Sequence, residues 1–170
     1  VESFHEHSDK RKIAKIISLL EDGKNLALVT DAGTPGISDP GARLVEVARE
    51  SGFSIVSIPG PSALTASLSV AGVSADEFLF LGFLPHKKGR ETLFREIAAS
   101  KRTVVFYESP HRVIKSLESL YRFAPDKKVV VCRELTKLHE EVKSGPAGDV
   151  LEYFKQNPDH TRGEFVVIVK

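Results

Sequence analysis

The hydrophobic positions of this chain follow two patterns, one with the spacing of amphipathic helices and one of short apolar runs typical of buried strands. The segment 8–22 has roughly helical spacing and is followed by Gly23, which predicts a helix with a glycine after its C-terminus. The segments 25–30 and 53–58 are short apolar runs bounded by turn residues, which predicts two strands.

The alternation of strands and helices continues to the end of the chain. Asp39 and Pro40 suit an N-cap and a first helical position, which predicts a helix that runs to about Glu50. Further helices are expected over 62–72, 89–100, 109–123 and 148–156, and further apolar, strand-like runs over 78–85, 103–108, 127–135 and 163–170.

This order of elements indicates the α/β class. Strands that alternate with helices at such spacing are typical of βαβ units and of a largely parallel sheet. The stretch VSADE, residues 73–77, interrupts the order. We therefore expect two small α/β domains, residues 1–74 and residues 75–170.

The composition is that of a globular protein without a strong overall charge. Among 170 residues, 41% are hydrophobic and 28% charged, and 24 basic side chains nearly balance 23 acidic ones. A polyanionic partner would therefore have to be bound by a local patch. The single cysteine, Cys132, lies in an apolar run, where we expect a buried thiol rather than a nucleophile or a metal ligand.

The ends and the hydropathy of the chain favour a cytoplasmic protein. One cysteine allows no disulfide within the chain, no apolar stretch approaches the roughly 20 residues that span a bilayer, and the first residues are too polar for a signal peptide. No membrane partner is expected. Because the chain begins at Val1 and contains no methionine, we expect that it is a fragment of a longer protein.

Two loops carry the strongest signs of ligand binding. The loop 31–41 has three glycines and two prolines between a predicted strand and a predicted helix, and the loop 58–63 has the same setting. Glycines let the backbone approach a ligand, and a helix N-terminus favours an anion. A tight connection with unusual dihedral angles is the alternative. Neither loop has the Walker lysine pattern or the G-x-G-x-x-G pattern, which argues against ordinary nucleoside triphosphate and dinucleotide sites.

Six segments, taken in order, resemble the motifs of one family. They are VTDAGTPGISDPG, IPGPSA, FLGFLPHKKG, VFYESPHR, CRELTKLHEE and GEFVVIV. Together they resemble the tetrapyrrole methylase superfamily and, within it, the methyltransferases that modify a ribose 2′-hydroxyl of small-subunit ribosomal RNA. The resemblance implies two α/β domains with S-adenosylmethionine between them. It also implies a first domain truncated at its N-terminus, because the family's earlier strand, its Pro/Gly-rich loop and its E-D-T-R segment have no counterpart here.

The resemblance also implies which residues hold the cofactor. The first loop and the following turn would bind the methionine and ribose parts, and segments of the second domain would approach the adenine. The residues concerned are Asp31, Ala32, Gly33, Thr34, Pro35, Gly36, Ile37, Ser38, Asp39, Pro59, Gly60, Ser62, Ala63, Leu81, Gly82, Phe83, Leu84 and Glu164. Because of the truncation, we expect the chain alone to bind the cofactor weakly and not to turn over.

A cluster of polar residues follows the predicted strand 103–108. Ser109 and Pro110 suit an N-cap and a first helical position, which is a sufficient structural reason for both. A ribose hydroxyl holds its proton tightly, so a nearby base or an electrostatic partner should assist methyl transfer. The candidates for that role are Glu108, Asp31, Arg133 and Glu134.

A basic loop supplies the candidates for RNA contact. Lys87, Lys88 and Arg90 lie in the HKKGR segment, and His111 and Arg112 follow the strand 103–108. A solvated surface is the alternative reading. No metal is expected, because His5, His7 and His139 lack the spacing of a known ligand set.

The other functions that remain open are methylation of a tetrapyrrole or corrinoid precursor or of diphthine, and RNA binding without catalysis. The family resemblance implies a homodimer.

Overall fold

The computed structural model describes residues 1–5 and 10–170, and it divides into two compact units, Val1–Ser62 and Ala63–Lys170. The division falls earlier than the expected boundary between residues 74 and 75, because helix α3 (Ala63–Val70) packs on the sheet of the second unit. The expected boundary itself stays a prediction. His7 and the first two residues of the expected helix 8–22 lie outside the described residues.

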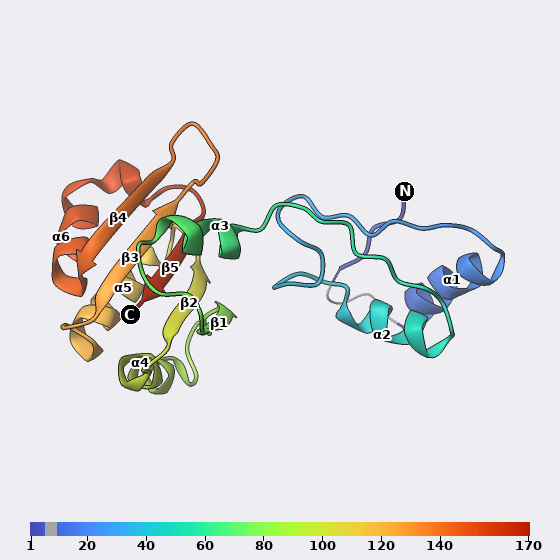
Figure 1. Cartoon of the computed structure of the whole chain (residues 1–170), viewed down its shortest axis with the longest axis horizontal. Coiled ribbons are helices and arrows are strands. Elements are labelled where there is room, and N and C mark those ends of the chain that lie inside the picture. The colour runs from blue at the N-terminus through green and yellow to red at the C-terminus, as the bar shows by residue number, and fades with distance from the viewer. Residues whose placement is uncertain (6–9) are drawn as a thin grey trace. The chain divides into compact units, whose positions relative to one another are not determined.

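The second unit is built on one five-stranded sheet with the order β1-β2-β5-β3-β4 (Figure 1). Its strands are β1 (Phe78–Phe83), β2 (Thr103–Glu108), β3 (Lys128–Arg133), β4 (Glu141–Pro146) and β5 (Phe165–Val169). Only β1 and β2 run parallel, and the other three pairs are antiparallel. The α/β class is confirmed, but the expectation of a largely parallel sheet is wrong for this unit.

Helices cover both faces of this sheet. The helices beyond α3 are α4 (Arg90–Ala99), α5 (Val113–Phe123), α6 (Ala147–Gln156) and a short 3-10 helix, η1 (Pro158–Thr161). Side chains alternate along the strands, so that Val104 and Phe106 face α4 to α6 while Val105 faces α3. Each central strand is therefore buried on both faces, which explains why its sequence is a continuous apolar run.

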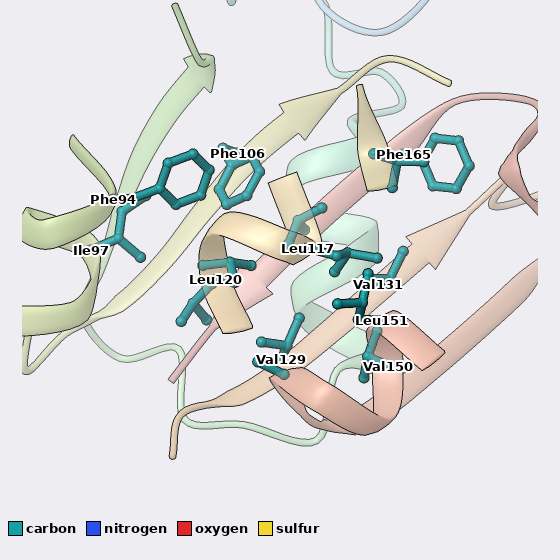
Figure 2. Packing of buried hydrophobic residues seen from close by; sticks show 14 of the residues in the cluster. Phe94, Ile97, Phe106, Leu117, Leu120, Val129, Val131, Val150, Leu151 and Phe165 are labelled. Atoms are coloured by element: carbon teal, nitrogen blue, oxygen red, sulfur yellow. The ribbon is translucent and has the colours of Figure 1, made fainter. Parts of the chain in front are cut away.

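The larger core lies under α4, α5 and α6. Phe94 of α4 meets Phe106 of β2 edge to face, with ring centroids 6.4 Å apart. Figure 2 shows Leu117 of α5 and Val150 of α6 among the same side chains, and both are fully buried. This core holds the carboxyl end of β2 in place, where the predicted catalytic cluster begins.

The first unit has a small core between two helices. Helix α1 (Lys10–Glu21) buries Ile13 and Ile17 against Ala48 of α2 (Ala42–Glu50). The segments 25–30 and 53–58, expected as strands, have no regular secondary structure and form no ladder in the described structure. The strand prediction is wrong here because a strand requires hydrogen-bonded neighbours, and apolar periodicity does not supply them.

Two helix starts also differ from expectation. Helix α2 begins at Ala42 after Gly41, whose φ of 144° is easily adopted only by glycine, so Asp39 is not its N-cap. Helix α5 begins at Val113, because a turn closes first, with the N–H groups of Arg112 and Val113 donating to the carbonyl of Ser109. Ser109 and Pro110 therefore precede the helix instead of opening it.

One strand was not anticipated at all. Strand β4 lies in the polar segment after residue 135, and its burial alternates between half-buried and exposed positions. An edge strand with polar residues on one face gives only a weak hydrophobic pattern.

Candidate functional site

In the first unit, the glycine-rich loop and the following turn lie side by side. The hydroxyl of Thr34 donates a hydrogen bond to the carbonyl of Pro61, 3.1 Å away. The loop also closes on itself, because the N–H of Ile37 donates to the carbonyl of Thr34 at 3.2 Å. The two predicted cofactor segments of this unit are therefore brought together, although not by a parallel sheet.

The backbone of this loop is open to a ligand. Gly33 and Gly36 have φ values of 71° and 82°, and a Cβ atom added at either would meet no other atom within 4 Å. Ser38 also adopts a positive φ, 55°, which is uncommon for a residue with a side chain. Backbone held in such conformations is typical of ligand loops. The loop thus fits a group that is bound through main-chain atoms.

Asp31 opens the same loop with an exposed side chain. Pro59 and Gly60 of the neighbouring turn are exposed as well. An exposed carboxylate beside open backbone is accessible both to a bound molecule and to a second substrate.

In the second unit, Glu108 ends β2 with a carboxylate that is completely buried. Its Oε1 accepts a hydrogen bond from the N–H of Ser109 at 2.8 Å, and its Oε2 accepts one from the hydroxyl of Ser116. Arg112 Nε lies 2.7 Å from Oε1, and Arg90 Nη2 lies 3.6 Å from Oε2. The Arg112 Nε–H makes no hydrogen bond with good geometry, so that contact is an ion pair by charge and distance. Two guanidinium groups thus compensate one buried carboxylate.

The same two arginines hold the segment that leaves β1. Arg112 Nη1 donates to the carbonyl of Leu84 at 2.9 Å, and Arg90 Nη1 donates to the carbonyl of Pro85 at 3.0 Å. Their side chains are only about one-seventh exposed, with relative areas of 14% and 15%. Arg90 and Arg112, both predicted to contact RNA, therefore point into the protein in this structure.

The remaining predicted RNA contacts lie on the surface. Lys87 and Lys88 are exposed, and so is His111 in the turn before α5. Gly89 adopts a left-handed conformation, with a φ of 79°, and lets the loop enter α4. The structure therefore presents two lysines on a loop whose base is held by two largely buried arginines.

Arg133 and Glu134, at the end of β3, belong to two polar clusters. Arg133 Nε donates to the carbonyl of Arg162 at 2.6 Å, and Nη1 lies 3.7 Å from Glu141 Oε2. Glu134 Oε1 accepts from the N–H of Glu164 at 2.8 Å. That N–H and the ammonium group of Lys137 lower the pKa of Glu134 below its ordinary value.

The adenine-side candidates have mixed positions. The side chain of Leu84 is buried in the core, whereas Phe83 is 56% exposed. Gly82 has a φ of 59°, at the irregularity in the pairing of β1 with β2. Glu164 is exposed and forms an ion pair with Lys137 at 2.8 Å.

Several partners of these residues were missed by sequence reasoning. Ser116 lies four residues after Arg112, and this i,i+4 spacing indicates that the two side chains share one helix face, on which both contact Glu108. Glu141 accepts a hydrogen bond from the hydroxyl of Tyr153, and this hydrogen bond raises the pKa of Tyr153. Glu141 also lies 2.9 Å from His160 Nδ1. No sequence signal pointed to this cluster, because its members come from β4, α6 and η1.

Other chemistry has little support in the described residues. Cys132 is buried, and burial raises the pKa of its thiol to about 11. In residues 1–5 and 10–170, His, Cys, Asp and Glu side chains form no group of three that would suit a metal ion. None of the helices described there combines the length and apolar character needed to cross a membrane.

A comparison with known protein families identifies the family of this chain. The chain belongs to the family of tetrapyrrole (corrin/porphyrin) methylases, which it matches over residues 1–151. Solved structures with the same fold include the methyltransferase CobJ, with a TM-score of 0.67 and 20% identity over 93% of this chain and 69% of that one. Another is uroporphyrin-III C-methyltransferase from Thermus thermophilus complexed with S-adenyl homocysteine, with a TM-score of 0.59 and 16% identity over 94% of this chain and 72% of that one. Identities this low establish the fold alone.

Curated relatives are similar at a higher level. The chain is 42% identical to ribosomal RNA small subunit methyltransferase I of Escherichia coli O157:H7 over 99% of its own length and 59% of that protein. It is 39% identical to the protein of the same name from Thermotoga maritima, over 98% of its length and 74% of that protein. The chain therefore spans about three-fifths of the first relative and about three-quarters of the second.

Proposed function

We propose that this chain carries the cofactor loops and the RNA-contacting unit of an S-adenosylmethionine-dependent methyltransferase that modifies small-subunit ribosomal RNA. The observation that carries the proposal is the 42% identity, over nearly the whole chain, to a protein named for that reaction. The acceptor we propose is a ribose 2′-hydroxyl. Since ribosomal RNA is a cytoplasmic substrate, we also propose that the protein acts in the cytoplasm.

The cofactor would be held in part by the first unit. The residues proposed are those of the loop from Asp31 to Asp39 and of the turn Pro59, Gly60 and Ser62. Support comes from the hydrogen bond between Thr34 and Pro61 and from the open backbone at Gly33 and Gly36. From the second unit we propose Ala63, the segment 81–84 and Glu164. When bound, the cofactor supplies a methyl group that is already activated by the sulfonium charge, so the protein's main task is positioning.

The acceptor hydroxyl requires a group that takes or stabilises its proton. Among the four proposed candidates, Asp31 has an exposed carboxylate next to the open loop. The carboxylate of Glu134 already accepts hydrogen bonds from Glu164 N–H and from Lys137, and these contacts lower its pKa. Arg133 is tied to three carbonyl groups, and Glu108 is buried. Accessibility therefore favours Asp31 for the role at the hydroxyl.

Contact with RNA would be made by Lys87, Lys88 and His111. All three are exposed, and the two lysines stand on one loop. Lysines bind phosphate oxygens and fix the register of the RNA without reading its sequence. The near-zero net charge of the chain makes such a local patch necessary.

Transfer of tritium from methyl-labelled S-adenosylmethionine by the methyltransferase that includes this chain tests the function. The expected result is label in small-subunit ribosomal RNA, resistant to alkali at the modified linkage because a 2′-O-methyl group blocks cleavage. Label in a tetrapyrrole precursor and none in RNA would contradict the proposal. RNA binding without label, under conditions where the cofactor binds, would favour a non-catalytic RNA-binding protein.

A binding titration tests the cofactor loop separately. Gly33→Ala and Gly36→Ala should each weaken S-adenosylmethionine binding, because a Cβ atom would occupy the space that is now open. Gly52→Ala is the matched control, since Gly52 also has a positive φ, 84°, open surroundings and a place in the same unit. Equal losses in all three variants would show that backbone strain alone is responsible.

We also propose a homodimer, as in the family that the chain resembles. Sedimentation equilibrium should give twice the mass of 18.7 kDa. A single species at 18.7 kDa would contradict the homodimer.

A further inference from the structure

The buried carboxylate of Glu108 stands at the centre of a network that ends on a loop. Its Oε1 accepts a hydrogen bond from Ser109 N–H and its Oε2 accepts one from the Ser116 hydroxyl, while the two guanidinium groups lie beside it as ion pairs. A general base needs a free lone pair directed at its substrate. In this structure the carboxylate is completely buried and its oxygens face protein partners.

The network leads outward to the segment between β1 and α4. Each arginine uses one nitrogen near Glu108 and another on a loop carbonyl, at Leu84 or at Pro85. Arg90 is fixed further, because Nη2 donates to the Ser116 hydroxyl at 2.7 Å and its guanidinium lies 5.1 Å from the Phe94 ring centroid. The planar, forked guanidinium suits such simultaneous contacts in a way that lysine does not.

The loop so held carries the exposed basic residues. Residues 85–89 join the clamped carbonyls to α4, and His86, Lys87 and Lys88 are exposed on it. The backbone of the loop is tightened by the N–H of Arg90, which donates to the carbonyl of Lys87 at 3.2 Å. A loop ordered before binding loses less conformational entropy when it meets a ligand.

We infer that Glu108 is a positioning residue that acts through Arg90 and Arg112 to hold the loop 85–89 in one conformation, so that Lys87 and Lys88 meet RNA phosphates preorganised. The part that concerns RNA rests on the proposed function, and the part that concerns the loop does not. The clamp also explains why one buried carboxylate lies with two largely buried guanidinium groups, since removing one partner would leave the others uncompensated.

Trypsin cleavage after Lys87 and Lys88 tests the clamp without reference to RNA. In Glu108→Gln the isosteric amide keeps its size but loses the charge that attracts both arginines. Cleavage in the loop should accelerate roughly tenfold or more, because proteolysis follows the population of the open loop. Glu108→Asp, which keeps the charge, should restore part of the protection.

Glu141→Gln is the matched control. Glu141 is also a largely buried carboxylate near an arginine, Arg133, and its replacement changes the net charge by the same amount. It lies in another cluster, so cleavage after Lys87 and Lys88 should stay at the wild-type rate. Unchanged cleavage in folded Glu108→Gln would overturn the clamp. If Glu108→Gln does not fold, Arg112→Lys and Arg90→Lys replace it, and unchanged cleavage in both would overturn the clamp equally.

RNA affinity, measured on small-subunit ribosomal RNA across a salt titration, tests the positioning role. Glu108→Gln should bind several-fold more weakly than Glu141→Gln but with an unchanged salt slope, because both lysines are still present. Lys87→Ala with Lys88→Ala should flatten the slope by about 2, since fewer counterions are released. Faster cleavage of Glu108→Gln with the RNA affinity of Glu141→Gln would leave the clamp intact and overturn the loop's role in RNA binding. Wild-type cleavage and wild-type RNA affinity, together with abolished methyl transfer, would overturn positioning in favour of a base.

Discussion

Gly163 occupies a restrictive glycine position in the second unit. Its φ is 102°, and a Cβ atom built there would lie 2.5 Å from Cγ and 2.7 Å from Oε1 of Glu134. Glu134 cannot move away freely, because its Oε1 accepts from Glu164 N–H and from Lys137 Nζ at 3.0 Å. We predict that Gly163→Ala strongly destabilises this unit.

The size of the effect has two parts. A non-glycine residue at positive φ costs about 1–2 kcal/mol. Displacing Glu134 breaks a hydrogen bond between a charged acceptor and a backbone N–H, which contributes about 1.5–3 kcal/mol. The exposed ion pair with Lys137 adds little because solvent screens it. The free energy of unfolding should therefore fall by about 2.5–5 kcal/mol, the sum of the two ranges.

Tyrosine fluorescence during urea unfolding measures this loss in the relevant unit alone. The chain has three tyrosines and no tryptophan, and Tyr107, Tyr121 and Tyr153 all lie in the second unit. Gly72→Ala is the control, because Gly72 has a φ of 60° in the same unit but open surroundings. It should lose only the backbone part, about 1–2 kcal/mol.

A double-mutant cycle decides whether the contact with Glu134 is responsible. A Glu134→Ala background removes the three atoms nearest to the added methyl group, so Gly163→Ala should lose only about as much there as Gly72→Ala. Equal losses from Gly163→Ala in both backgrounds would refute the contact and leave backbone strain as the entire cause.

Three further predictions concern the same unit. Leu117→Ala should lower the free energy of unfolding by about 2–5 kcal/mol in the same urea assay, because it opens a cavity in a fully buried part of the core; a loss below about 1 kcal/mol would mean that the core collapses around it. Since the pKa of Glu134 is lowered in the folded state, its contribution to stability is present above its ordinary pKa of 4.5 and lost as the pH falls through the lowered value. Unfolding measured from neutral to acidic pH should therefore show a shallower acid loss for Glu134→Gln than for wild type, and parallel curves would contradict this. Cys132 should react with iodoacetamide at pH 8 only as fast as the unit opens, since the thiol is buried and its pKa is about 11; rapid labelling of the native protein would show a different environment.

Sequence patterns predicted the elements that bury a continuous or periodic apolar face. Strands β2, β3 and β5 are apolar throughout because both faces of the sheet are covered, and α5 shows clear helical spacing. Strand β4 escaped prediction because its positions alternate between half-buried and exposed, so its sequence has no continuous apolar run. The segments 25–30 and 53–58 were predicted as strands because they are apolar, but they pair with no neighbouring strand in the described structure.

The candidate site was predicted only as far as local sequence reaches. The glycine loop, with its positive φ values at Gly33 and Gly36, follows from composition and position. The direction of a long side chain does not, and Arg90 illustrates this. In sequence it belongs to a basic surface segment, whereas its guanidinium contacts Ser116 and lies near Glu108, 26 and 18 residues further along the chain. Charge alone therefore could not distinguish the residues that hold the loop from those that it presents.

The position of Glu108 in the loop clamp bears on which carboxylate acts as the base of the reaction. A buried carboxylate that forms ion pairs with two guanidinium groups must keep those contacts throughout, because breaking them leaves buried charges uncompensated. A carboxylate that accepts a proton from a substrate must instead be reachable and must release its partner in each cycle. Glu108 satisfies the first condition, since its side chain is fully buried, and Asp31 satisfies the second, since it is exposed beside open backbone. Asp31→Asn should therefore lower methyl transfer while loop cleavage by trypsin and RNA affinity stay unchanged, the opposite of the pattern expected for Glu108→Gln. If Asp31→Asn instead retains full transfer at every pH, the acceptor proton leaves without this carboxylate.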